Sequence, residues 1–187
     1  MKHSIPKKIV LIGASTGGPG HIQKIIQSLP KLQDTSLVIG QHMVKGFMNS
    51  FADRFKNIDN NIVVVEDNQT FESNNIYICE EETELSNSNF SKKESGLNSY
   101  NPDINILFNS FVPLAKEVKI LCVILTGIGD DGVEACKGLS LHGSRCLTEN
   151  AESAIVDGMP SRARLLVKNI EIYDIDAITK KISEFCE

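Results

Sequence analysis

Three short segments of the chain carry side chains whose types suit nucleophilic catalysis. Gly13, Ser15 and Gly17 form a G-x-S-x-G pattern directly after the apolar residues 9–12. In such a strand-to-helix turn the glycines permit a sharp bend that exposes the serine hydroxyl. The next backbone N–H, that of Thr16, then faces the oxyanion that develops during acyl transfer. Ser15 is therefore a candidate nucleophile, and the Thr16 N–H is a candidate oxyanion donor.

The same glycines also fit a phosphate-binding loop at the start of a helix. Two details argue against that alternative. Residue 23 is Gln where a G-x-G-x-x-G pattern starting at Gly18 requires its third glycine, and no Lys-Ser or Lys-Thr pair completes a P-loop. From this motif alone, a hydrolase and a nucleotide site are about equally supported.

His42 favours the hydrolase. It follows the predicted strand at residues 36–39, and this strand end has no acidic residue that could hold a ribose. Because the carboxyl ends of neighbouring parallel strands meet at one edge of a sheet, we expect His42 near Ser15. A neutral imidazole can accept the serine proton and return it to the leaving group. Three other histidines have no predicted catalytic role: His3, His21 and His142.

Two carboxylates follow the apolar residues 120–125 in a glycine-rich turn. Asp130 and Asp131 precede Gly132, which begins a predicted helix. An aspartate there can orient the histidine of a triad, or it can accept hydrogen bonds from free N–H groups at the start of the helix. Spacing alone does not decide which aspartate has which role.

Apolar, β-branched runs alternate with amphipathic stretches along the chain. The predicted strands are residues 8–12, 36–39, 62–65, 76–78, 120–125 and 145–148. The predicted helices are residues 20–29, 47–55 and 102–115, one that starts near 132, and 176–185. This alternation predicts an α/β fold with a doubly wound, mostly parallel sheet and helices on both faces, a Rossmann-like three-layer sandwich. The polar residues 79–100 predict a small hairpin excursion.

Composition narrows the function classes. The 187 residues suit one domain, and the formal net charge of -5 opposes binding to nucleic acid. The apolar run at residues 9–12 is too short for a signal peptide or a membrane span, so we expect a cytoplasmic protein without membrane insertion. The cysteines have no spacing typical of a zinc site or redox pair, and we expect them to be reduced and mostly buried: Cys79, Cys122, Cys136, Cys146 and Cys186.

Four segments in order resemble one family, the catalytic domain of the protein-glutamate methylesterase of bacterial chemotaxis, also called CheB. The segments are residues 12–19 around the serine, residues 41–52 around the histidine, residues 125–132 around the aspartates, and residues 158–160. The match spans nearly the whole chain. In chain order the histidine precedes the aspartate, unlike the usual α/β-hydrolases, where it comes last.

The resemblance implies a triad of Ser15, His42 and Asp131, with Asp130 as a variable neighbour. It implies hydrolysis of glutamate methyl esters on methyl-accepting chemotaxis receptors, with release of methanol and an additional glutaminase activity. It implies no metal and no cofactor. Lys45 and Arg54 flank the histidine segment and could attract a glutamate-rich receptor helix, although ordinary surface charge explains them equally well.

The chain departs from the family pattern at several positions. Ile128 replaces a methionine, Val44 a proline and Asn105 an aspartate, and residues 80–85 replace a segment with proline and histidine. No triad member is lost, although Asn105 and residues 80–85 could alter the substrate groove. Relatives commonly carry a receiver domain before the catalytic domain. Here the first predicted strand begins near residue 8, so we expect one methylesterase domain over residues 1–187 and no receiver domain.

Two other functions stay open from sequence. The first is a nucleotide-binding, Rossmann-type oxidoreductase, which the missing glycine and missing acidic residue weaken. The second is a catalytically silent receptor-binding module that keeps the fold. The intact set of Ser15, His42 and Asp131 argues against it.

Overall fold

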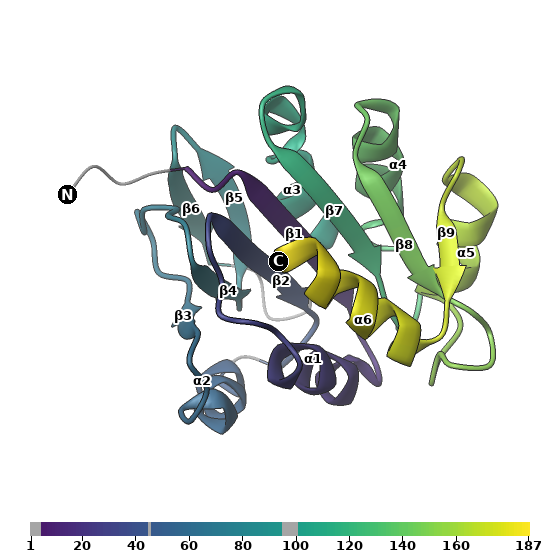
Figure 1. Cartoon of the computed structure of the whole chain (residues 1–187), viewed down its shortest axis with the longest axis horizontal. Helices are drawn as coiled ribbons and strands as arrows, with labels where there is room; N and C mark the ends of the chain where they lie inside the picture. The colour runs from purple at the N-terminus through teal and green to yellow at the C-terminus, as the bar shows by residue number, and fades with distance from the viewer. Residues whose placement is uncertain (1–4, 45, 95–100) are drawn as a thin grey trace.

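A parallel sheet forms the centre of the computed structural model, which describes residues 5–44, 46–94 and 101–187 (Figure 1). Within those ranges the sheet has seven strands in the order β3-β4-β2-β1-β7-β8-β9. Every neighbouring pair is parallel. The strands are β1 (Lys8–Ala14), β2 (Thr35–Gln41), β3 (Asn61–Val64), β4 (Asn75–Cys79), β7 (Lys119–Ile124), β8 (Arg145–Glu149) and β9 (Glu171–Tyr173). The predicted doubly wound sheet is confirmed.

Helices cover both faces of the sheet. α1 and α6 lie on one face, and α3, α4 and α5 on the other (Figure 1). The helices are α1 (Gly18–Gln27), α2 (Met48–Ala52), α3 (Ile104–Asn109), α4 (Val133–Leu141), α5 (Met159–Leu166) and α6 (Ile175–Cys186), with short 3-10 turns η1 (Asp53–Phe55) and η2 (Val112–Lys116). This is the expected three-layer arrangement.

The core has two halves because successive residues of a strand point to opposite faces. In β1, Ile9 and Leu11 pack into the half beneath α3 and α4, whereas Val10 and Ile12 pack into the half beneath α1 and α6. All four side chains are fully buried. A strand buried on both faces needs a continuous apolar run, which explains why residues 9–12 show no polar alternation.

The predicted excursion is an antiparallel hairpin, β5 (Glu82–Ser86) paired with β6 (Asn89–Lys93). Phe90 on β6 packs its ring against Phe71 and Tyr77 and so joins the hairpin to the core. The Ser110 hydroxyl at the end of α3 accepts a hydrogen bond from the Leu85 N–H at 2.9 Å. Residues 95–100 of the predicted excursion lie outside the described residues.

The structure differs from the sequence prediction at several elements. The helix predicted at residues 47–55 is α-helical only over Met48–Ala52, and η1 follows it. The helix expected at residues 102–115 ends at Asn109, and η2 follows it. Pro113 lies in the first turn of η2, where its missing N–H and its ring prevent one continuous helix. α5 and β9 were not predicted, because α5 carries two arginines among eight residues and β9 is a three-residue edge strand.

Candidate active site

The side chains of Ser15, His42 and Asp131 meet at the carboxyl edge of the sheet. They follow β1, β2 and β7, which are adjacent in the order β2-β1-β7. The chain leaves β1 towards β2 on one side and later returns to β7 on the other side. In open α/β sheets, a crevice for ligands forms at such a reversal of strand order.

Ser15 lies in the turn between β1 and α1 and is 7% exposed. Its backbone N–H donates to the Thr126 carbonyl at 2.9 Å, and its own carbonyl accepts from Gln41 Nε2 at 2.9 Å. Gly17, the residue before α1, has a φ of 86°. Residues other than glycine rarely adopt this backbone conformation, and a Cβ at this position would also collide with the Ile155 side chain. The glycine therefore permits the sharp turn that presents Ser15.

His42 lies between Ser15 and Asp131, and 8% of its side chain is exposed. Its Nε2 is 2.7 Å from Oδ2 of Asp131, and its Nδ1 is 3.2 Å from Oγ of Ser15. An ionised carboxylate can only accept hydrogen bonds, so the proton belongs on Nε2 and Nδ1 is left to accept from the serine hydroxyl. The ring is turned relative to chymotrypsin, where Nε2 faces the serine.

Asp131 is held by three hydrogen-bond donors. Its Oδ2 accepts from the Ile104 N–H at 2.8 Å as well as from His42, and its Oδ1 accepts from the Asn105 N–H at 3.0 Å. Burial raises the pKa of Asp131. The hydrogen bonds from His42 and the two backbone N–H groups outweigh burial and lower that pKa below its ordinary value. The carboxylate is therefore ionised at neutral pH.

The structure separates the two aspartates that the sequence left open. Asp131 faces His42, whereas Asp130 is exposed and contributes its backbone carbonyl to the Val133 N–H at 3.1 Å. Gly132 follows with a φ of 85°, and a Cβ there would come within 2.5 Å of the Ile104 side chain. A residue other than glycine would strain the turn that holds Asp131 against α3.

The Thr16 N–H, the candidate oxyanion donor, lies beside Ser15. Thr16 is exposed, and its carbonyl accepts from the Thr126 hydroxyl at 2.9 Å. Within the described part of the chain, the Thr16 N–H makes no hydrogen bond. It is therefore available to an oxygen of a ligand.

Of the two candidate docking residues, Lys45 lies outside the described residues. Arg54 lies in η1, where its guanidinium carbon is 5.9 Å from the centroid of the Phe51 ring, and it contacts none of Ser15, His42 and Asp131.

Comparison with known proteins places this arrangement in a family. The model of the CheB methylesterase domain matches residues 10–182. The chain belongs to the CheB methylesterase family. Its fold matches the crystal structure of the Thermotoga maritima CheB methylesterase catalytic domain with a TM-score of 0.83 and 27% identity, over 96% of this chain and 99% of that chain. These matches do not support the nucleotide-binding alternative.

Curated relatives of the CheB family carry one shared name, protein-glutamate methylesterase/protein-glutamine glutaminase. The chain is 32% identical to such a protein from Carboxydothermus hydrogenoformans over 95% of its own length and 53% of the relative. It is 33% identical to one from Escherichia coli strain K12 over 94% of its own length and 52% of the relative. The chain spans about half the length of the curated relatives it matches.

The departures from the CheB pattern leave Ser15, His42 and Asp131, the three candidate catalytic residues, in place. Asn105 lies beneath Asp131, and its Oδ1 accepts from the Ala135 N–H at 3.0 Å, so it links α3 to α4. Glu80 accepts from the Gly46 N–H at 2.8 Å, close to the histidine segment. Ile128 and Val44 are strongly exposed.

Glu149, at the carboxyl end of β8, is a supporting residue that the sequence analysis missed. It is fully buried, and its carboxylate accepts from the Thr126 N–H at 2.6 Å and from the Ser153 hydroxyl at 2.9 Å. His21 Nδ1 lies 3.2 Å away without hydrogen-bond geometry. Thr126 in turn binds the backbones of Ser15 and Thr16, so Glu149 fixes the serine turn from below. No sequence pattern indicates this support, because Glu149 acts on Thr126, which lies 23 residues earlier in the chain.

A set of exposed apolar side chains flanks the site, and the sequence analysis did not single it out as a surface. We call it the apolar rim: Val44, Phe47, Ile128 and Ile155. The first two follow His42, Ile128 precedes Asp131 in the same turn, and Ile155 packs against Gly17 beside Ser15. Large apolar side chains exposed around a site typically mark a binding surface.

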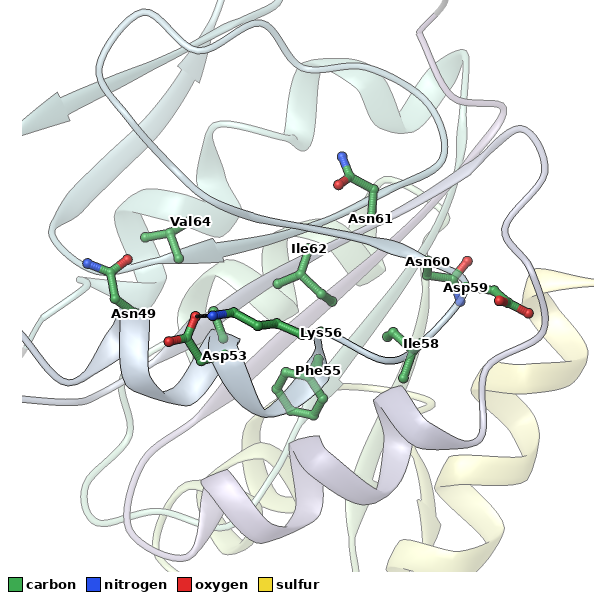
Figure 2. A pocket seen from close by; sticks show the side chains of 11 residues that line it. Asn49, Asp53, Phe55, Lys56, Ile58, Asp59, Asn60, Asn61, Ile62 and Val64 are labelled. Carbon is green, nitrogen blue, oxygen red and sulfur yellow. Dashed lines mark ion pairs between the residues drawn. The ribbon is translucent and has the colours of Figure 1, made fainter.

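A separate surface hollow of about 630 Å³ lies between α2, η1 and β3. Figure 2 shows its lining, which includes Phe55, Ile62 and the ion pair of Lys56 with Asp53. No residue of the Ser15, His42 and Asp131 group lines it. No helix in the described ranges has the length and apolar character that a membrane span requires.

Proposed function

We propose that this chain is a serine esterase that hydrolyses glutamate methyl esters on chemotaxis receptors. The observation that carries the proposal is the hydrogen-bonded series from Ser15 Oγ through His42 to Asp131 Oδ2. Together with membership of the CheB methylesterase family, it supports Ser15 as nucleophile, His42 as general base and Asp131 as the residue that orients the histidine.

In the proposed reaction, Ser15 Oγ attacks the ester carbonyl carbon while Nδ1 of His42 takes the hydroxyl proton. The Thr16 N–H donates to the developing oxyanion. The tetrahedral intermediate collapses, and methanol leaves with the proton from His42. Water activated by His42 then hydrolyses the acyl-enzyme and restores a receptor carboxylate. The ionised Asp131 stabilises the imidazolium in both steps.

The same groups suit deamidation of a receptor glutamine. The two reactions share a tetrahedral intermediate and an oxyanion, and they differ in the leaving group, which is ammonia instead of methanol. The shared name of the curated relatives, methylesterase and glutaminase, supports this second activity.

The proposed partners are methyl-accepting chemotaxis receptors, whose methylated helices this protein would bind in the cytoplasm. The apolar rim gives such a helix an apolar surface next to Ser15. Lys45 and Arg54 remain predicted electrostatic contacts that would act at longer range.

A measurement of methanol release from methylated receptor membranes tests the proposed function. We expect wild-type protein to release methanol and Ser15→Ala to release none above background. Ser28→Ala is a matched control and should keep the wild-type rate, because Ser28 is exposed at the end of α1 and its hydroxyl donates to the Lys24 carbonyl. Absence of methanol from wild type while it still binds the membranes would favour the silent receptor-binding module instead.

A further inference from the structure

Three buried cysteines meet beneath α4, away from the serine site. Cys122 on β7 and Cys146 on β8 are paired in register across the sheet, and Cys136 lies on α4 above them. Their Sγ atoms all lie within 4.8 Å of one another. None of the three residues is more than 4% exposed. Three thiols from three separate elements therefore share one small, buried volume.

No sequence pattern predicts this group, because no two of the three cysteines are closely spaced along the chain. The remaining cysteines, Cys79 and Cys186, are also buried but do not belong to the group. Burial of an isolated cysteine needs no explanation, since the residue behaves as a small apolar side chain. Convergence of three sulfurs is a different feature, because it creates a set of soft ligands.

We infer that Cys122, Cys136 and Cys146 form a binding site for a soft monovalent metal ion, Cu⁺, held by three sulfur atoms. Thiolate ligands select soft ions such as Cu⁺. A metal–sulfur bond of about 2.3 Å sets the sulfurs of a trigonal site about 4 Å apart. Small side-chain rotations from the observed separations reach that distance.

The number of ligands distinguishes Cu⁺ from Zn²⁺. Structural zinc sites are almost always four-coordinate. Among the residues that the structure describes, no further His, Cys, Asp or Glu joins the three cysteines. The three cysteines belong to the same core half as Leu139, Ala163 and Val167, and the Ser140 hydroxyl lies beside Cys146. Three sulfurs without a fourth His, Cys, Asp or Glu ligand suit a three-coordinate ion.

Binding of Cu⁺ must displace protons from the thiols. The Cys146 thiol donates weak hydrogen bonds to the Cys136 and Ser144 carbonyls at 3.6 and 3.7 Å, so its proton has to leave before its sulfur can bind the ion. As each sulfur–copper bond forms, any proton still on that thiol passes to solvent, and no oxidation or reduction occurs.

Competition for Cu⁺ under anaerobic conditions tests the inference. Reduced protein is equilibrated with Cu⁺ held by the coloured chelator bicinchoninate. We expect one equivalent of Cu⁺ to move to each wild-type chain, with sulfur-to-copper charge-transfer absorption in the ultraviolet. X-ray absorption of the copper should show three sulfur neighbours. Binding to the folded state should raise the midpoint of thermal unfolding by at least about 5 °C.

Variants assign the copper to its ligands. Cys122→Ser, Cys136→Ser and Cys146→Ser should each lower the amount of Cu⁺ retained at least tenfold, whereas Cys79→Ser and Cys186→Ser, also at buried positions, should retain it. If a ligand variant fails to fold, the wild-type X-ray absorption still decides. The inference is overturned if wild type loses Cu⁺ to the chelator, if the bound ion has nitrogen or oxygen neighbours only, or if Zn²⁺ but not Cu⁺ binds the three cysteines.

Discussion

The Nδ1 atom of His42 lies 3.2 Å from Oγ of Ser15, on the opposite side of the imidazole from the 2.7 Å contact between Nε2 and Asp131. The aspartate therefore determines which nitrogen carries the proton and which one can act as a base. In chymotrypsin the two nitrogens have the reverse assignment. The same acid–base chemistry is available in both orientations, because each nitrogen of a neutral imidazole can donate or accept.

Replacement of Asp131 tests this assignment. Asp131→Asn should lower kcat for demethylation by about 10⁴-fold, because an amide can stabilise the wrong tautomer of His42 and cannot stabilise the imidazolium. Asp130→Asn is the matched control and should change kcat less than about threefold, since Asp130 is exposed. Kinetic measurements on receptor membranes compare the two. A larger loss in Asp130→Asn than in Asp131→Asn would contradict the assignment.

The value of kcat/KM should fall below neutral pH as one group of the enzyme becomes protonated. Histidine side chains commonly gain their second proton between about pH 5 and 8, and a protonated imidazole cannot accept the serine proton. Asp131 keeps its charge throughout that range, because its hydrogen bonds lower its pKa below the ordinary value of 3.8. The logarithm of kcat/KM should therefore fall with a slope of one as pH decreases. A flat profile, or a slope of two, would argue against His42 as the sole titrating base.

Glu149 should act as a positioning residue for the serine turn. Glu149→Leu removes the acceptor of the Thr126 N–H and the Ser153 hydroxyl, and we expect a loss of about 3 kcal/mol in the free energy of unfolding. Glu149→Leu should also lower kcat for a small ester while leaving its KM unchanged. Glu149→Gln keeps an acceptor, so it should retain much of the wild-type kcat and stability. Urea unfolding and ester kinetics measure these effects. If Glu149→Leu behaves like Glu152→Leu, a change at an exposed neighbour, Glu149 does not position the turn.

The apolar rim should govern receptor binding more than chemistry. Phe47→Ser and Ile128→Ser should each raise KM for receptor membranes about tenfold, because each removes an exposed apolar contact. Hydrolysis of a small activated ester should be unchanged. Leu141→Ser is the control, since Leu141 is as exposed as Val44 but lies at the opposite end of α4 from Asp131. Equal effects of Leu141→Ser and Phe47→Ser on KM would show that the rim has no special role.

Strand ends were the features most accessible from sequence. The apolar runs that precede Ser15 and the Asp130–Asp131 pair are long enough to predict buried parallel strands, and parallel strands bring their carboxyl ends to one edge. The choice between Asp130 and Asp131 depended on the family resemblance. The residues alone did not decide it, because the turn geometry set by Gly132 and the N–H groups of α3 determines which carboxylate faces His42.

Features that depend on packing between distant elements were inaccessible. The support of Thr126 by Glu149 and the convergence of Cys122, Cys136 and Cys146 each join different strands or a strand and a helix. Neither leaves a periodic or closely spaced pattern in the sequence. The break before Pro113 was predictable in principle, since proline disfavours a helical conformation at the preceding residue.

Single and double substitutions of Ser15 and His42 test the central claim most directly, namely that the two residues act as one catalytic unit. Methanol release from methylated receptor membranes is measured for wild type, Ser15→Ala, His42→Ala and the double variant, with folding checked by circular dichroism. The effects of substituting residues that act as one unit are strongly non-additive. All three variants should therefore fall to the same residual rate, several orders of magnitude below wild type. A double variant that loses the product of the two single effects, or a Ser15→Ala protein that retains wild-type activity, would contradict the account.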